Sequence, residues 1–363
     1  MTRTPQRSDD DHSERRLHFY CSYCDHRYLP RALALYESMR RHCGPFRFWL
    51  LCLSDECYQA ARALALPNLE PVRLQTLEAA DNALASAKRE RTTVEYYFTL
   101  TPSLMAWLLR ANPHIDVLTY LDADIYFFSS PRFLLREFAD HATLIVPHRF
   151  SPRNFERRKW GLYNVGWVSF RRDQDGLACL EWWRRSCLEW CRDIVEEHRY
   201  ADQKYLDQFP KRFQRVQIAS HPGVNLAPWN LDNYTLSSEP GETPHVEGMP
   251  VIFFHFHRLR RITPFLWHTR HRQYHAPFNR EIRVALYAPY LEAIARAEHR
   301  LNGLIPDAAP LRRRLTEPWR RRPLRELVGA ALAMSRGWIW HIRVIERGAP
   351  KTTRKQRALV SSP

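Results

Sequence analysis

Two pairs of side chains, each separated by one residue, could bind a divalent metal ion. Asp122 and Asp124 interrupt the apolar run VLTYLDADIYFF, and His255 and His257 end the run VIFFHFH. Residues two apart on an extended strand point the same way, so each pair can converge on one point. Two carboxylate oxygens suit Mg²⁺ or Mn²⁺ better than zinc, and one histidine could complete such a site.

Both pairs also have explanations that need no ligand. The aspartates could end a strand with both carboxylates in solvent, and the histidines could lie at the edge of the core. Carboxylates in an apolar setting are costly unless something pairs with them. The apolar residues on both sides of Asp122 and Asp124 therefore favour a metal site.

Alternating strands and helices must position these residues. The pattern predicts strands at 17–23, 46–53, 69–77 and from 117, with helices starting at Pro30 and spanning about 56–66 and 102–110. This alternation predicts an α/β domain with a mostly parallel central sheet flanked by helices. The aspartates would then lie at the carboxyl end of a strand, where open α/β sheets bind ligands.

Further along, the periodicity predicts a short helix from Pro131, strands at 141–148, 164–173 and 251–257, and a long helix at about 176–197. Beyond 280 the pattern is helical. We therefore expect a disordered tail over 1–16, one α/β domain over 17–280, and a basic helical extension over 281–363.

The charge balance favours acidic partners. Lysines and arginines number 55 against 39 acidic residues, a net charge of +16. Nucleic acid is one such partner, but no zinc-finger, RNP-type or basic-zipper pattern is present, so we expect no nucleic-acid binding. A nucleic-acid-binding protein would also leave the paired aspartates unexplained.

The cysteines and the N-terminal sequence indicate the cellular compartment of the protein. Cys21 and Cys24 form one C-x-x-C, with no second pair for zinc; a redox role is possible, and burial near the first strand is the simpler explanation. The N-terminus lacks an apolar signal region, and no run of about 18 apolar residues occurs. We therefore expect reduced thiols and a cytoplasmic location.

Later segments, taken together with YLDADIYFF, carry a family resemblance. YNVGWVSFR, YADQKYLDQFP and a late H-F follow in order. The set resembles the metal-dependent, nucleotide-sugar-using glycosyltransferases of the GT-A fold. The nearest type is glycosyltransferase family 8, which includes glycogenin and bacterial lipopolysaccharide galactosyltransferases. The resemblance spans roughly 17–270; each motif is weak, but the ordered set is fairly specific.

The resemblance implies a role for each matching residue. Asp122, Asp124 and His255 would hold Mn²⁺ or Mg²⁺, with His257 as a substitute for His255. Residues that would bind the donor or its nucleotide are Ser22, Asp25, Tyr28, Asn164, Gly166, Arg258 and Arg261. Asp202 and Gln203 would be catalytic, and Asn225 and Trp229 would face the donor or the acceptor.

Some of these residues also have simpler interpretations. Asn164 could cap the start of a strand, and Asp202 with Gln203 could open a helix. Trp182, Trp183 and Trp190 at helical spacing indicate packing rather than a sugar platform.

The late motif departs from the family pattern H-F-x-G-x-x-K-P-W. Here HFHRLRRITPF places Arg258 where the family has glycine and Arg261 where it has lysine, so we expect a different backbone there. Arg258, Arg260 or Arg261 could still neutralise the β-phosphate. Lys204 replaces an aspartate common after D-Q. These departures indicate a distant subfamily and leave the donor sugar open.

The implied reaction is transfer of a hexose from a nucleotide sugar, most readily a UDP-sugar, to a glycan or lipid-linked hydroxyl acceptor, as in surface glycan or lipopolysaccharide assembly. Family 8 implies retention of configuration. Gln203 would offer a carbonyl oxygen to the cationic sugar, and Asp202 would orient donor hydroxyls. The alternative is a non-catalytic sugar-nucleotide or metal-binding protein of the same fold.

The C-terminal segment needs a separate explanation. Between 311 and 357, arginine clusters alternate with Trp319, Trp338 and Trp340. This composition suits a helix lying on an anionic membrane surface, which would make the chain peripheral to the inner face of the cell membrane. A solvated helical face or a disordered tail fits the same residues.

Overall fold

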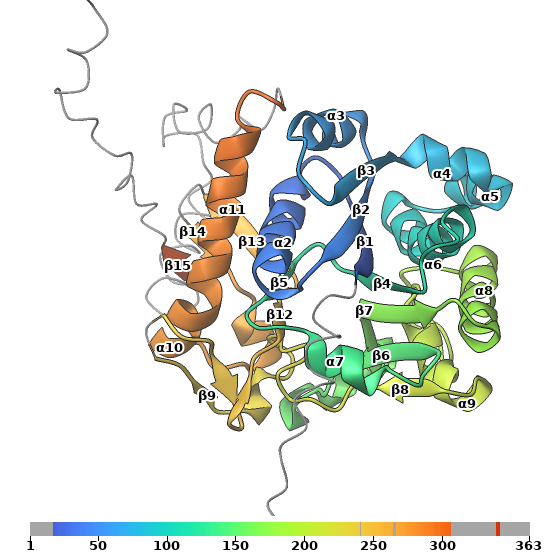
Figure 1. Cartoon of the computed structure of the whole chain (residues 1–363). Helices are drawn as coiled ribbons and strands as arrows, with labels where there is room; N and C mark the ends of the chain where they lie inside the picture. Colours follow the sequence, from blue (N-terminus) through green and yellow to red (C-terminus); the bar gives the residue numbers. More distant parts are fainter. Residues whose placement is uncertain (1–16, 240, 264–265, 306–338, 342–363) are drawn as a thin grey trace, which may run out of the picture.

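The computed structural model of the protein describes residues 17–239, 241–263, 266–305 and 339–341. The tail over 1–16 and most of the basic extension over 281–363, including Trp319 and Trp338, lie outside these residues. A seven-stranded sheet forms the centre of the molecule (Figure 1). Its strands are β1 (His18–Cys24), β2 (Phe46–Cys52), β3 (Leu69–Arg73), β4 (Val117–Leu121), β6 (Thr143–Pro147), β7 (Tyr163–Arg171) and β8 (Val216–Ile218).

The sheet order places β4 in the middle. The strands run β3-β2-β1-β4-β7-β6-β8. The pairs from β3 to β4 are parallel, β7 is antiparallel to both β4 and β6, and β8 is parallel to β6. The predicted α/β class with a mostly parallel central sheet is therefore confirmed.

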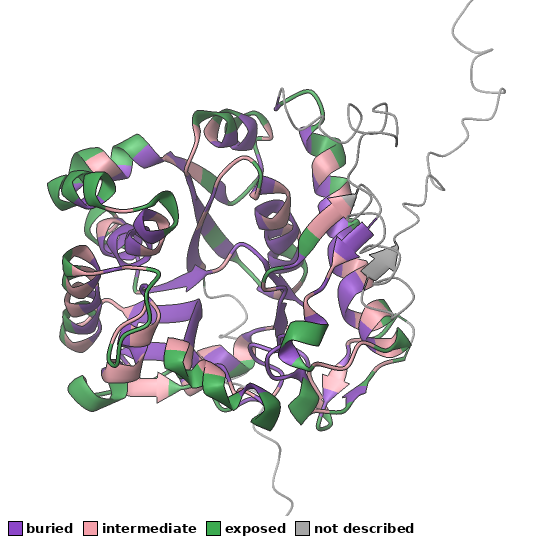
Figure 2. Cartoon of the chain, turned by 180° about the vertical axis from the view of Figure 1, so that it is seen from behind, coloured by how far each residue is buried: buried purple, intermediate pink, exposed green. Residues whose placement is uncertain are grey.

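Helices cover both faces of this sheet because its strands are apolar on both sides. In β2, Phe48 and Leu50 pack into one core cluster, whereas Trp49 and Leu51 pack into another. Figure 2 shows the strands largely buried and the outward faces of the helices exposed. The first face is covered by α2 (Leu29–His42), α3 (Asp55–Ala63), α7 (Arg132–Glu137) and α11 (Ala288–Leu301). The second is covered by α4 (Leu74–Ala80), α5 (Asn82–Glu90), α6 (Thr93–Ala111), α8 (Gln174–Glu189) and α9 (Phe209–Arg212).

Three predicted boundaries are wrong. The third strand ends at Arg73, and the rest of the predicted strand is α4. Helix α6 starts well before 102 because Thr92 and Glu95 form a capping box at its N-terminus. Helix α8 ends at Glu189 rather than 197.

A small two-stranded sheet connects distant parts of the chain. Strand β5 (Ile125–Phe127) follows the two aspartates and pairs antiparallel with β12 (Phe253–His255), so that His255 lies opposite Ile125. The predicted strand 251–257 is therefore shorter, and His257 lies beyond its end. This pairing brings a late segment of the chain to the end of β4.

Short elements complete the fold. The strands are β9 (Leu236–Ser237), β10 (His245–Val246), β11 (Met249–Pro250), β13 (Arg260–Thr263), β14 (Leu266–His268) and β15 (Ile339–His341). The helical turns are η1 (Pro152–Trp160), η2 (Lys204–Gln208), η3 (Leu231–Asn233), η4 (His271–Tyr274), α10 (Arg280–Ile282) and η5 (Arg283–Tyr287). Strand β15 pairs with β14 and is the one described part of the chain beyond 305. Within the described ranges, none of the helices is long and apolar enough to cross a membrane.

Candidate metal centre and arginine pocket

The two aspartates lie in the turn that follows β4 at the carboxyl edge of the parallel strands. Strand β4 ends at Leu121, and the turn is closed by the N–H of Ile125 donating to the carbonyl of Asp122 at 3.2 Å. The Asp122 N–H donates to the Gly166 carbonyl at 3.1 Å, which ties the turn to β7. The side chains converge through this turn geometry rather than through strand alternation, contrary to the sequence argument.

Asp122, Asp124 and His255 come together in one cluster. Their ligand atoms all lie within 4.8 Å of one another. Nε2 of His255 lies 3.1 Å from Oδ1 of Asp124 and 3.6 Å from Oδ2 of Asp122. His257 is not part of this group; its ring centroid lies 5.6 Å from that of His255. Of the two histidines, the structure thus brings His255 to the carboxylates.

A chain of hydrogen bonds orients the His255 ring. The Gln203 amide donates from Nε2 to the Trp160 carbonyl, and its Oε1 accepts from Nδ2 of Asn164 at 3.0 Å. The Asn164 Oδ1 then accepts from the Gly166 N–H and from Nδ1 of His255, each at 3.1 Å. With Nδ1 donating, the lone pair of the neutral ring lies on Nε2 and faces both carboxylates.

This arrangement fits a divalent ion. Two carboxylates and the Nε2 lone pair face one another, and a divalent cation, or a proton on Nε2, offsets their repulsion. The hydrogen bond from Nδ1 to Asn164 is the kind of outer contact that fixes a metal-binding histidine. Gly166 makes the approach possible, because a Cβ there would lie 2.4 Å from Oδ1 of Asn164 and 2.9 Å from Nδ1 of His255.

The pKa shifts reflect the same geometry. Burial raises the pKa of both carboxyl groups, and at Asp124 the nearby His255 ring reverses this and lowers the pKa below its usual range. Burial lowers the pKa of His255, but Asp124 and Asp122 more than offset it, so that the pKa of His255 is raised. A proton on Nε2 and a metal ion would therefore compete for the same lone pair.

Asp202 and its neighbour Gln203 lie on the side of Asn164 opposite to His255. Asp202 is buried, and its Oδ2 accepts from the Thr101 hydroxyl at 2.8 Å. Burial raises the pKa of Asp202 to about 7, and the negative charge of Asp122 adds to the effect. Ala201, just before it, has a left-handed backbone with φ of 47°, a conformation that costs energy and clusters at functional sites.

Trp229 packs against both histidines. The Trp229 ring contacts His255 and His257 edge-on, with centroids 5.2 and 5.3 Å apart. Asn225 donates from Nδ2 to the Pro147 carbonyl at 3.0 Å. The Trp229 Nε1 and the Asn225 Oδ1 are buried and have no hydrogen-bond partner among the described residues.

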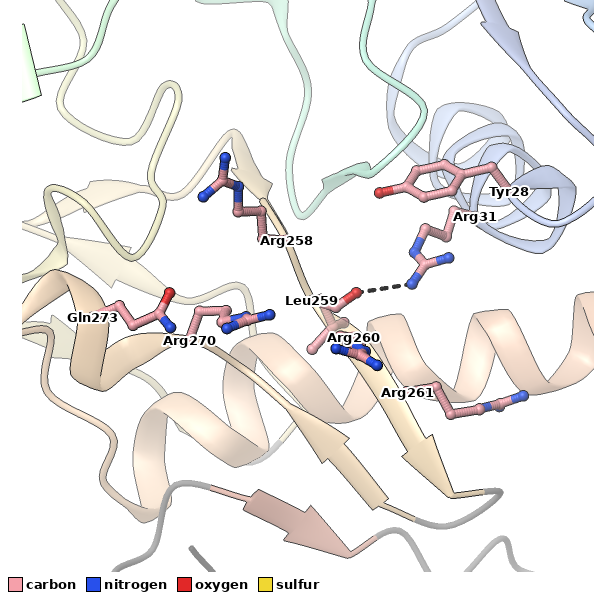
Figure 3. A pocket seen from close by; sticks show the side chains of 8 residues that line it. All are labelled: Tyr28, Arg31, Arg258, Leu259, Arg260, Arg261, Arg270 and Gln273. Atoms are coloured by element: carbon pink, nitrogen blue, oxygen red, sulfur yellow. Dashed lines mark hydrogen bonds between the residues drawn. The ribbon is translucent and has the colours of Figure 1, made fainter. Parts of the chain in front are cut away.

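A basic pocket of about 560 Å³ opens beside the cluster (Figure 3). It is lined by Tyr28, Arg31, Arg258, Leu259, Arg260, Arg261, Arg270 and Gln273. Tyr28 joins the pocket to the metal cluster, because its hydroxyl donates to Oδ2 of Asp124 at 3.2 Å. Arg31 donates to the Leu259 carbonyl at 2.9 Å and stacks on Tyr28, with its guanidinium 4.3 Å from the ring centroid.

The pocket arginines differ in their partners. Arg261 is bound by Glu298 through two hydrogen bonds of 2.6 and 2.9 Å. Arg258, Arg260 and Arg270 have no acidic partner within the described part of the chain. Arg258 has φ of 56°, in the left-handed region that glycine favours. We expected a backbone different from that of glycine at this position, and the structure does not show one.

The remaining predicted nucleotide residues lie at the end of β1. Ser22 is fully buried within the strand, and its hydroxyl has no partner among the described residues. The Asp25 carboxylate accepts from the Tyr28 N–H at 2.8 Å and fixes the turn into α2. Tyr28 is thus the member of this group that reaches the pocket.

Sequence reasoning missed Arg31 and Arg270. Arg31 lies one turn after Tyr28 on α2, a spacing that could have indicated a shared face. Arg270 precedes η4 with φ of 64°, and nothing in its sequence context indicates a role. The eight cysteines are buried free thiols, so no C-x-x-C disulfide is present.

Comparison with known proteins places the chain in a family. It is 30% identical over 251 residues to the uncharacterized protein YfnF of Bacillus subtilis strain 168, covering 67% of this chain and 82% of that protein. The chain belongs to the YfnF family. It is also 26% identical over 286 residues to the uncharacterized protein YfnD of the same strain, covering 77% of this chain and 89% of YfnD. No family model matches the chain.

Solved structures similar to this YfnF-family chain are glycosyltransferases. The galactosyltransferase LgtC, in complex with donor and acceptor sugar analogues, is 17% identical with a TM-score of 0.43, covering 77% of this chain and 95% of LgtC. Mouse xyloside xylosyltransferase 1 is 13% identical with a TM-score of 0.45, covering 67% of this chain and 98% of that enzyme. At these identities the likeness assigns neither donor nor acceptor.

Proposed function

We propose that the chain is a metal-dependent glycosyltransferase of the GT-A type that transfers a sugar from a nucleotide-sugar donor to a hydroxyl acceptor. The observation that carries the proposal is the position of the Asp122–Asp124–His255 cluster directly beside a pocket whose arginines, except Arg261, have no carboxylate partner in the described part of the chain. A donor diphosphate needs both a divalent ion and fixed positive charge. The ordered motifs YLDAD, YNVG, ADQ and HF support the same class.

Asp122, Asp124 and His255 would hold Mn²⁺ or Mg²⁺, and the ion would act as a Lewis acid on the departing diphosphate. The arginines add charge that does not depend on pH, because guanidinium remains protonated throughout the physiological range. Arg31 and Arg258 line the pocket where that charge would meet the phosphates. Fixed donors of this kind lower the cost of charge that develops on a leaving group.

Gln203 and Asp202 are suited to the sugar end of the reaction. The Gln203 Oε1 accepts one hydrogen bond from Asn164 and keeps a second lone pair, which could stabilise an oxocarbenium-like sugar. Its amide is held at the other end by the Trp160 carbonyl at 3.0 Å. Asp202, held by Thr101, would accept hydrogen bonds from donor hydroxyls.

The finer assignments follow from the family resemblance. A UDP-linked hexose is the proposed donor, and a glycan or lipid-linked hydroxyl is the proposed acceptor. The hexose would be transferred with retention of its anomeric configuration. Arg261 is less suited to the diphosphate than expected, since Glu298 already neutralises it. A cytoplasmic location beside the inner face of the membrane remains the proposal for the basic C-terminal segment.

The test is a binding and hydrolysis screen of UDP-, GDP- and dTDP-sugars with the full chain, with and without Mn²⁺. We expect one nucleotide class to bind and to be hydrolysed slowly in a Mn²⁺-dependent manner. Binding without turnover, in the presence of sugar and glycolipid acceptors, would instead favour a non-catalytic sugar-nucleotide-binding protein. No binding of any sugar nucleotide under either condition would overturn the proposal.

A further inference from the structure

The arginine pocket carries more positive charge than the proposed donor can neutralise. Four of the lining arginines, namely Arg31, Arg258, Arg260 and Arg270, have no carboxylate partner among the residues that the structure describes, and none of the eight lining residues is acidic. Asp122 and Asp124 would be balanced by the divalent ion. The diphosphate of a sugar nucleotide carries two negative charges, which leaves two of the four arginines without a counter-charge.

The surplus lies across the pocket from the wall that contacts the metal cluster. Tyr28, which donates to Asp124, and Arg31, which stacks on Tyr28, form that wall. Arg260 and Arg270, with Gln273, form the other side, and Figure 3 shows Arg270 and Gln273 opposite Tyr28 and Arg31. Figure 3 shows Arg270 directed into the space between Gln273 and Leu259.

Buried polar atoms in the pocket wall also lack partners. Nε of Arg270 and Nε of Arg31 are both buried and have no hydrogen-bond partner among the described residues. An unpaired buried donor is costly, and more so when the group is charged. A bound oxyanion could accept from these donors, and a phosphate matches the fork of a guanidinium particularly well.

The outer side of the pocket is connected to the proposed catalytic residues through η1. The guanidinium of Arg157 donates to the Gln273 carbonyl at 2.7 Å, and the Trp160 carbonyl at the other end of η1 accepts from Gln203. A ligand held by Arg270 and Gln273 would therefore be connected through η1 to Gln203, the residue proposed to face the transferred sugar.

We infer that the outer side of the pocket, formed by Arg260, Arg270 and Gln273, binds a phosphate group carried by the acceptor, so that the acceptor belongs to the class of phosphorylated alcohols or glycans. This inference rests on the proposed function and specifies its acceptor. Two sources share the chemistry: a soluble phosphate ester and the phosphate of a lipid at a membrane surface.

The experiment titrates sn-glycerol 3-phosphate into the full chain already saturated with UDP and Mg²⁺, followed by calorimetry. The wild type is expected to bind this probe without releasing UDP, and not to bind uncharged glycerol. Arg270→Ala should weaken probe binding about tenfold more than it weakens UDP binding, whereas Arg62→Ala, at an exposed position on α3, should change neither. Arg260→Ala provides a second variant if Arg270→Ala fails to fold.

A parallel arm distinguishes the two sources of phosphate. Co-sedimentation with phosphatidylcholine vesicles is compared with and without phosphatidic acid. Binding that depends on phosphatidic acid and on Arg270, with no binding of the soluble probe, assigns the phosphate to a lipid-linked acceptor.

Three results would overturn the inference. They are displacement of UDP by the probe, equal binding by the Arg270→Ala and Arg62→Ala variants, and no binding in either arm. Failure of the proposed function would look different. If no sugar nucleotide of the screen binds, the titration is repeated without nucleotide, and probe binding lost in Arg270→Ala would keep the anion site while the transferase proposal falls.

Discussion

The metal cluster and the arginine pocket lie side by side but are built in opposite ways. Asp124 and His255 are buried, and His255 is oriented through Asn164 by a connected chain of hydrogen bonds. Arg258 and Arg260 are exposed and have no carboxylate partner among the described residues. The cluster is thus organised by the protein, whereas the pocket requires a ligand to balance its charge.

This difference separates two kinds of binding. A pre-oriented cluster binds its ion through geometry, so changes to its supporting residues should affect metal affinity strongly. An exposed set of cations acts through charge, which salt screens over about 10 Å at 0.1 M ionic strength. Substitutions in the two regions should therefore differ in size and in salt dependence.

The largest effect is expected from Asp124→Asn. Removing one carboxylate charge while preserving the shape should lower Mn²⁺-dependent hydrolysis of the donor about a thousandfold, because the remaining ligands bind the ion poorly. The measurement is single-turnover hydrolysis of the nucleotide sugar found in the screen. Asp140→Asn, at an exposed position, is the matched control. Retention of a tenth of wild-type activity by Asp124→Asn would count against the cluster as the metal site.

Asn164→Ala should weaken metal binding about 10- to 100-fold, because the His255 ring loses the acceptor that orients it. Calorimetry with Mn²⁺ measures the affinity, and thermal unfolding checks that the variant is folded. Asn82→Ala, on the exposed start of α5, should behave as wild type. Equal Mn²⁺ affinity in Asn164→Ala and wild type would show that the hydrogen bond to His255 has no part in metal binding.

The metal affinity should fall as the pH is lowered. Burial lowers the pKa of His255, but the two carboxylates more than offset this and raise it in the metal-free chain, so a proton competes with Mn²⁺ for Nε2 as the pH falls. Below that pKa each pH unit should cost about tenfold in Mn²⁺ affinity, and above it the dependence should flatten. Calorimetry between pH 5.5 and about 8.5 tests this. An affinity independent of pH across this range would contradict ligation by His255.

Arg258→Ala should weaken binding of the donor nucleotide about tenfold and reduce its salt dependence, because one unpaired charge is removed from the pocket. Mn²⁺ affinity without nucleotide should stay close to that of wild type, since Arg258 is not one of the three proposed ligands. A parallel loss of metal affinity would erase the distinction between the two regions.

Arg261→Ala should have the smallest effect on the nucleotide. Glu298 already neutralises this arginine, so nucleotide affinity should change by about twofold or less. The free energy of unfolding should fall by about 1 kcal/mol with loss of the ion pair, measured by urea denaturation. A loss of nucleotide affinity as large as that in Arg258→Ala would show that Arg261 leaves Glu298 to bind the donor.

Much of the fold could be predicted because its central strands are apolar on both faces. The run from Val117 to Leu121 fixes β4 as a buried strand, and the charged residues after it mark its carboxyl end. The start of α6 and the end of α8 were harder to predict. Thr92 caps the N-terminus of α6, and tertiary contacts rather than periodicity end α8.

The site was predictable in its residue types but not in its contacts. The spacing of Asp122 and Asp124 indicated a shared ligand, but their convergence depends on a turn and on the pairing of β5 with β12. That pairing joins two three-residue strands far apart in the chain, which no local pattern specifies. Likewise, only the folded chain shows that Glu298 binds Arg261, while Nε of Arg270 has no partner within the described ranges.

The most direct measurement of the central claim is Mn²⁺ binding followed by electron paramagnetic resonance, which detects the free ion. The wild type should remove one Mn²⁺ per chain from solution and do so more tightly when UDP is present, and Asp124→Asn should lose both effects. Identical titrations of wild type and Asp124→Asn, with and without UDP, would contradict the assignment of Asp122, Asp124 and His255 as a metal centre for a nucleotide-sugar donor.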